Sequence, residues 1–118
     1  MSTTSYKDLT REISSNMAAL HKGVPGVMKG FGDMAKAAIA DGALDAKTKE
    51  LISLALAVAA RCDACITFHA SSAVRLGATR DEVMEAVGMA IFMGAGPAAM
   101  YAAQAVEAFD QYAAKQTG

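Results

Sequence analysis

Both cysteines of this chain and one of its two histidines lie within the stretch RCDACITFHA, residues 61–70. Cys62 and Cys65 are three residues apart, and His69 follows four residues later. A thiolate can attack a peroxide or a disulfide, a second thiol can close a disulfide with the first, and an imidazole can carry the proton that each step moves. The residue types and their spacing are therefore suited to thiol redox chemistry.

The three side chains can meet if the chain around them is helical. With Cys62 at or just before the start of a helix, Cys62, Cys65 and His69 point within an arc of about 60°. A helix N-terminus also presents unpaired N–H groups, which stabilise a thiolate and lower the pKa of its thiol. We expect this helix to begin near Asp63, which would serve as its cap, and to end at Gly77.

Two other uses of the cysteines remain open. Free cysteines often serve as small apolar fillers in a core, and this chain is rich in alanine. A C-x-x-C pair with a histidine and a carboxylate could also bind zinc, although zinc sites more often draw two ligand pairs from separate segments. A single pair beside a histidine at a helix start favours the redox interpretation.

The whole sequence predicts an all-α fold, a compact bundle of about six helices with short connections. No stretch shows the sustained alternation of a strand. The expected helices run from Ser5 to about Lys22, from Pro25 to Asp41 and Gly42, from the cap Asp45 to about 60, from Asp63 to Gly77, from the capping box Thr79–Glu82 to about 93, and from the turn at 94–97 to about Lys115.

Apolar spacing predicts which faces are buried. Leu9, Ile13, Met17 and Leu20 lie three or four apart along one face of the first helix, and we expect that face to be covered. The stretch LISLALAVAA, residues 51–60, is apolar on every side, which is typical of a helix in the centre of a bundle.

Length and composition limit the class of protein. The 118 residues fit one domain, residues 1–118. Apolar residues make up 53% of the chain, but many are alanines that bury little area, so we expect a homo-oligomer. The net charge is −1 and the basic residues are scattered, so we expect no basic surface of the kind that binds nucleic acid.

The sequence also bears on compartment. The N-terminal stretch MSTTSYKDLTREISS has no apolar core of a secretory signal, so we expect a cytoplasmic protein. Residues 86–106 carry no charge and are long enough to span a bilayer. Gly94, Gly96 and Pro97 interrupt them, however, and two helices meeting at a buried turn fit better than a membrane span.

The spacing of Glu50, Cys62, Cys65 and His69 resembles the motif of the AhpD-like alkylhydroperoxidase family, within the wider carboxymuconolactone decarboxylase group. Glu50 precedes Cys62 by twelve positions, and Cys65 and His69 complete the pattern. The resemblance covers roughly residues 45–112, including CDACITFH, ASSAVRLGATRDEVMEAV and MGAGPAAMYAAQAVEAF. From its position alone, Glu50 could equally be an exposed acid in the first turn of a helix.

The resemblance implies an all-helical subunit that forms trimers or hexamers and acts as a thiol peroxidase or disulfide reductase in antioxidant defence. By this likeness Cys65 attacks the peroxide, Cys62 resolves the sulfenic acid into a disulfide, and Glu50 and His69 relay protons. An external dithiol then reduces the disulfide, and no metal or other cofactor is expected. Ala64 stands where better-known relatives carry a second histidine, and alanine cannot relay a proton.

Two alternative functions stay open beside this one. The wider group includes lyases that act on a muconolactone, and such chemistry needs acid–base groups around a pocket rather than a cysteine pair. A zinc-binding or structural oligomer without catalysis is the other. His21, near the end of the first helix, is interpreted as a favourable charge at that helix terminus with no catalytic role. Phe68 and Phe92 are expected to line an apolar pocket near the cysteines.

Overall fold

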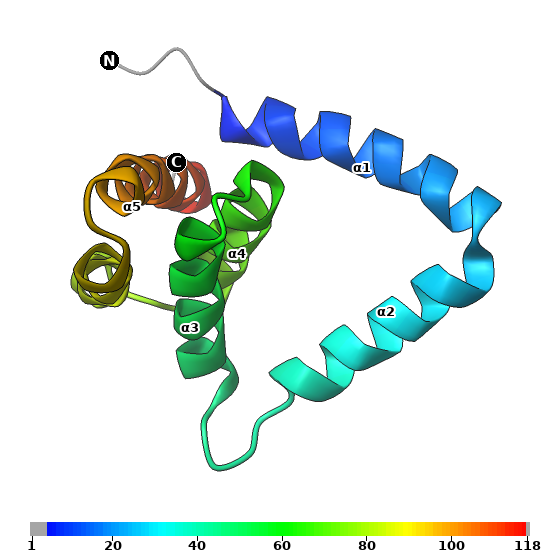
Figure 1. Ribbon diagram of the computed structural model, residues 1–118, viewed down its shortest axis with the longest axis horizontal. Helices are drawn as coiled ribbons and strands as arrows, with labels where there is room; N and C mark the ends of the chain where they lie inside the picture. The colour runs from blue at the N-terminus through cyan, green and yellow to red at the C-terminus, as the bar shows by residue number, and fades with distance from the viewer. Residues whose placement is uncertain (1–4, 118) are drawn as a thin grey trace.

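The computed structural model describes residues 5–117, and all regular structure within them is helical (Figure 1). The predicted all-α class is confirmed. The helices are α1 (Tyr6–Gly23), α2 (Pro25–Ile39), α3 (Ala46–Ala59), α4 (Asp63–Arg75) and α5 (Arg80–Thr117).

The core lies where α3, α4 and α5 pack against one another. Leu54 and Val58 of α3, Ile66 of α4 and Val83 of α5 are fully buried there. Alanines fill much of the remaining contact, and their small side chains let the helices approach closely. Figure 1 shows α1 and α2 as an arm that leaves this core beside α4 and returns to it at the start of α3.

Side-chain caps fix three of the helix starts as predicted. The Ser5 hydroxyl accepts the backbone N–H three residues on, at 3.2 Å, and the Asp45 carboxylate does the same at 2.8 Å. At the start of α5, the Thr79 hydroxyl accepts the Glu82 N–H at 3.1 Å while the Glu82 carboxylate accepts the Thr79 N–H at 2.8 Å. Each cap satisfies N–H groups that have no partner within the helix.

A break in α5 accounts for the difference between five helices and the six expected. Ala95 has non-helical backbone angles, φ 56° and ψ −136°, and divides the element into residues 80–94 and 96–117. Gly94 approaches the next segment so closely that a Cβ atom on it would lie 2.8 Å from the Cβ of Ala98. By length and composition alone α5 could cross a membrane, but this break falls near its middle.

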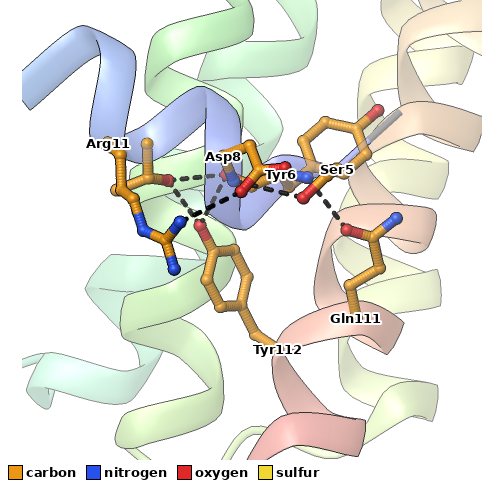
Figure 2. A network of polar contacts seen from close by, with 7 residues as sticks. Ser5, Tyr6, Asp8, Arg11, Gln111 and Tyr112 are labelled. Atoms are coloured by element: carbon orange, nitrogen blue, oxygen red, sulfur yellow. Dashed lines mark hydrogen bonds and ion pairs between the residues drawn. The ribbon is translucent and has the colours of Figure 1, made fainter. Parts of the chain in front are cut away.

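Hydrogen bonds join the start of α1 to α4 and α5 (Figure 2). The Tyr6 N–H donates to Gln111 Oε1 at 2.9 Å, and the Tyr6 carbonyl accepts from the Tyr112 hydroxyl at 3.2 Å. The fully buried Thr67 of α4 donates to the same carbonyl at 3.2 Å. Because Thr67 lies between Cys65 and His69 in the chain, this contact holds α1 against the helix that carries the cysteine pair.

Two predictions of burial were wrong for the single chain. The apolar face of α1 is only partly covered, and Leu20 is 49% exposed, because α1 contacts the core mainly through its first turns. The helix predicted to be central, α3, has one open side on which Ile52 and Leu56 are exposed. Apolar periodicity predicts that a helix face will be buried, but it does not say whether the same chain or another molecule buries it.

Candidate active site

The turn between α3 and α4 sets the position of Cys62. The Cys62 N–H donates to the Ala57 carbonyl, and the Arg61 N–H donates to the Val58 carbonyl, both at 3.1 Å, which is the Schellman arrangement that ends a helix. Arg61 occupies its left-handed position with φ 57°, where glycine is usual. α3 therefore stops sharply, and the next helix begins one residue after Cys62.

Cys62 is the residue that caps α4. Its sulfur accepts the Cys65 N–H at 3.1 Å, while Asp63 is the first residue inside the helix. The expectation that Asp63 caps this helix was therefore wrong, because the turn places the backbone of Cys62 in the extended conformation of a cap and its sulfur within reach of the free N–H.

Cys62 and Cys65 form a disulfide, so the site is in its oxidised form. Their Cα atoms are 5.2 Å apart, within the range that a disulfide spans without backbone movement. Both residues are half-buried. The pair can therefore cycle between dithiol and disulfide with little change in the fold.

Glu50 and His69 meet directly. Glu50 Oε2 lies 2.7 Å from His69 Nδ1, and the Glu50 side chain is 7% exposed whereas that of His69 is 35% exposed. The alternative of an exposed first-turn acid is thus wrong for Glu50. When Glu50 is ionised its carboxylate accepts the hydrogen bond and Nδ1 donates it, and Nε2 of a neutral imidazole is then a proton acceptor.

A cavity of about 630 Å³ opens between α4 and the arm formed by α1 and α2. Its size suits a small organic molecule. Cys65 and His69 are both among the residues that line it. The lining residues are Ile13, Ser14, Met17, Ala18, His21, Phe31, Ala64, Cys65, Phe68 and His69. Phe68 is among them as expected, whereas Phe92 lies on α5, 78% exposed, and is not.

A second cavity, of about 480 Å³, lies on the other side of the Glu50–His69 pair. Lys36 of α2 and Lys49 of α3 line it together with both members of the pair. His69 borders both cavities. Its position allows it to exchange protons with a ligand in the first cavity while the buried carboxylate holds its ring.

The structure brings the four predicted site residues into two bonded pairs, and one member of each pair, Cys65 and His69, lines the first cavity. It also places at this cavity a residue that sequence reasoning had left out of the site. His21 lines the cavity of Cys65 from the last turn of α1. Its separation of more than 40 residues from Cys65 gave no signal in the sequence, since only the fold of the α1–α2 arm brings α1 over α4.

Among the described residues, no three histidine, cysteine, aspartate or glutamate side chains are grouped as ligands for a metal ion. In the oxidised pair the two sulfur atoms are bonded to each other rather than free to bind zinc.

Comparison with known proteins finds a family that matches the chain. The model of the carboxymuconolactone decarboxylase family matches residues 25–108, most of the chain. An uncharacterized protein from Cupriavidus necator is 45% identical over 108 residues, which are 92% of this chain and 96% of that one.

Solved structures agree in fold. A carboxymuconolactone decarboxylase family protein from Legionella pneumophila superposes with a TM-score of 0.89 at 50% identity, covering 92% of this chain and 96% of that one. A family member from Thermotoga maritima, for which a role in an antioxidative response has been suggested, has a TM-score of 0.71 at 31% identity, covering 76% of this chain and 93% of its own.

Proposed function

The chain belongs to the carboxymuconolactone decarboxylase family, and from that premise we propose that it is a thiol-dependent oxidoreductase, reducing hydroperoxides or disulfides through the Cys62–Cys65 pair. The observation that carries the proposal is the cavity that both Cys65 and His69 line, with the ring of His69 held by the buried Glu50. A nucleophile, a resolving thiol and an oriented base are the groups that such a reaction needs.

Cys65 is the attacking residue in this proposal because it lines the cavity, whereas Cys62 does not. His69 removes the proton of the Cys65 thiol, with its imidazolium stabilised by the Glu50 carboxylate. The thiolate attacks the terminal oxygen of a hydroperoxide, so that a sulfur–oxygen bond forms, the oxygen–oxygen bond breaks, and the products are a sulfenic acid and an alkoxide that is protonated to the alcohol.

The second half of the cycle uses Cys62. Its sulfur attacks the sulfenic sulfur of Cys65, the sulfur–sulfur bond forms, and the hydroxyl group leaves as water after taking up the proton that Cys62 releases. An external dithiol then exchanges with the disulfide and is itself oxidised, which returns both cysteines to thiols. With a disulfide substrate in place of a peroxide, the same thiolate attacks sulfur and no sulfenic acid forms.

The relative from Thermotoga maritima adds support of a different kind, because the role suggested for it is antioxidative. We extend that role to this chain as part of the proposal, with catalysis in the cytoplasm by a homo-oligomer.

The test is to titrate the dithiol–disulfide equilibrium of the pair in dithiothreitol buffers and then to add cumene hydroperoxide to the reduced protein. The proposal expects a reversible disulfide between Cys62 and Cys65 that peroxide regenerates. Cys65→Ser should abolish peroxide consumption, whereas Cys62→Ser should consume about one equivalent and stop at the sulfenic acid, which a dimedone probe detects.

Two results would decide against the peroxidase form of the proposal. Unchanged turnover in Cys65→Ser would remove this residue as nucleophile. A reversible disulfide that peroxide does not regenerate would leave only the disulfide reductase activity.

A further inference from the structure

Arg61, the residue directly before Cys62, has a backbone conformation that is costly for any residue with a side chain. It occupies the left-handed position of the Schellman arrangement that ends α3, with φ 57°. A Cβ atom crowds the backbone in that region, which is why glycine is usual there. The end of α4 has the same arrangement, and there the left-handed residue is Gly77, with φ 84°. Two equivalent turns thus differ, and the turn beside the cysteines carries an arginine.

The turn itself gives no reason for the arginine side chain. Arg61 is exposed, and among the described residues no hydrogen bond or ion pair holds its guanidinium group. Asp63 lies in the first turn of α4, where a carboxylate interacts favourably with the positive end of the helix, and it forms no ion pair with Arg61. Within the described part of the chain, Arg61 is therefore an uncommitted positive charge, kept beside Cys62 despite backbone strain.

The position of this charge suits it to discriminate among ligands of the cysteine pair. The peptide link keeps Arg61 next to Cys62 in every side-chain conformation, because consecutive Cα atoms are about 3.8 Å apart. A Coulomb interaction needs no direct contact and acts over about 10 Å at 0.1 M salt. A small thiol or disulfide that exchanges with the pair must bring its own sulfur to the sulfur of a cysteine. A negative group a few bonds from that sulfur is then attracted by the guanidinium.

We propose that Arg61 is a specificity-determining residue, which favours small disulfides and thiols that carry a carboxylate near sulfur over neutral or cationic ones. The inference rests on the thiol–disulfide exchange proposed above and names the class of its substrate.

The exchange itself proceeds in two displacements. One thiolate of the pair attacks a sulfur of the substrate disulfide, whose sulfur–sulfur bond breaks and releases one substrate thiolate. The other cysteine attacks the resulting mixed disulfide and releases the second substrate thiolate, so that the Cys62–Cys65 disulfide forms. The substrate is reduced to two thiols, and their protons are those that the two cysteines give up.

The experiment compares three disulfides of similar size and different charge. Reduced protein at low salt and neutral pH is mixed with dithiodipropionate, which is anionic, dithiodiethanol, which is neutral, or cystamine, which is cationic. The rate constant for loss of free thiol is measured for wild type, for Arg61→Gln, which removes the charge, and for Arg61→Lys, which keeps it. Arg75→Gln, at the exposed last residue of α4, is the matched control for the loss of one positive charge. Each variant is compared with wild type for the same reagent, which cancels the intrinsic reactivity of the reagent.

We expect Arg61→Gln to slow the reaction with dithiodipropionate by about fivefold, to leave that with dithiodiethanol within about twofold, and to speed that with cystamine. Arg61→Lys and Arg75→Gln should keep the wild-type order of rates, and added salt should reduce the differences because it screens the charges. Equal slowing with all three reagents would indicate a general effect on the thiols rather than selection, and would overturn the proposal. An Arg75→Gln protein that behaves like Arg61→Gln would also overturn it.

Arg61→Gly tests the premise that the side chain is kept at a cost. Glycine adopts the φ of 57° without strain, so this variant should melt at a higher temperature than wild type while losing the preference for dithiodipropionate. A melting temperature at or below that of wild type would remove the cost, and with it the reason to assign the side chain a task, and would overturn the proposal.

The outcome also separates this inference from the function on which it rests. If wild type reduces all three disulfides and Arg61→Gln reacts at the same rates, the role of Arg61 is overturned and the exchange activity stands. If wild type reduces none of the three, the exchange activity itself is overturned, and the role of Arg61 with it.

Discussion

The Glu50–His69 pair shows at the scale of single residues how burial prepares a side chain for chemistry. A carboxylate that is 7% exposed cannot be satisfied by water, so it needs the hydrogen bond from the imidazole at 2.7 Å. The imidazole in turn is fixed in orientation and stays partly exposed toward the cavity of Cys65. On an open surface, water would compete for this hydrogen bond, and the pair would hold its orientation less firmly.

Replacing Glu50 by glutamine tests this pair. Glu50→Gln keeps the shape and a polar contact but removes the charge that stabilises the His69 imidazolium, so oxidation of Cys65 by cumene hydroperoxide should slow by about 100-fold. The rate is followed by loss of free thiol. Glu85→Gln, at an exposed position of α5, is the control and should leave the rate unchanged. Equal rates for wild type and Glu50→Gln would show that the pair is structural only.

At the scale of elements, helix termini and one sharp break decide where the site residues lie. α3 ends in a Schellman arrangement at Arg61, and α4 ends in the same arrangement at Gly77, whose φ is 84°. The two sharp ends fix the short helix that carries the cysteines between α3 and α5. Carboxylates at helix starts add a pH dependence to this framework.

Asp45 gives the clearest case of that dependence. Hydrogen bonds from the side chain and the backbone of Thr48 lower the pKa of the Asp45 carboxyl group below its ordinary value. The stabilisation is therefore complete above about pH 4 and is lost as the pH falls through the lowered pKa of the folded state. Asp45→Asn keeps an acceptor without a titrating group. Thermal unfolding followed by circular dichroism should show wild type losing more of its melting temperature than Asp45→Asn between pH 5 and about pH 2; parallel losses would contradict this account.

Gly94 lies next to the break in α5. Gly94→Ala would place a methyl group 2.8 Å from the Cβ of the buried Ala98, so we expect a loss of about 1–3 kcal/mol in the free energy of unfolding. Gly32→Ala, in open space on α2, should instead be neutral or gain up to about 1 kcal/mol from helix propensity. Urea unfolding measures both. A Gly94→Ala protein as stable as wild type would show that the close approach is not required.

At the scale of the whole molecule, the single chain leaves much apolar surface uncovered. The exposed large apolar side chains gather on α2, on the open side of α3 and around the break in α5. They include Val27, Phe31, Met34, Ile52, Leu56, Met89, Phe92, Met93 and Met100. Soluble monomers rarely expose so many, and further copies of the same chain are the expected cover.

The predicted homo-oligomer can be tested with a residue that the single chain does not need. Phe92 is 78% exposed, so Phe92→Glu should leave one chain folded but place a charge in an interface between copies. Sedimentation equilibrium should give a multiple of 12.2 kDa for wild type, a trimer or hexamer, and a smaller assembly for Phe92→Glu. Gln104→Glu, exposed on the later part of α5, adds the same charge as a control. A wild type that sediments as a 12.2 kDa monomer would rule out this prediction.

The sequence by itself determined the all-α class and most helix starts, and it named the four residues of the candidate site. Caps such as Ser5, Asp45 and Thr79 act within one turn, and the spacing of Cys62, Cys65 and His69 is a property of a single helix, so local rules were sufficient. Only the tertiary structure decided that Glu50 is buried against His69, that His21 and Cys65 line the same cavity, and that α3 keeps an open side. These depend on how α3 packs against α4 and α5 and on how α1 lies beside α4, which no short-range pattern encodes, because contacts between distant segments arise from packing of the whole chain.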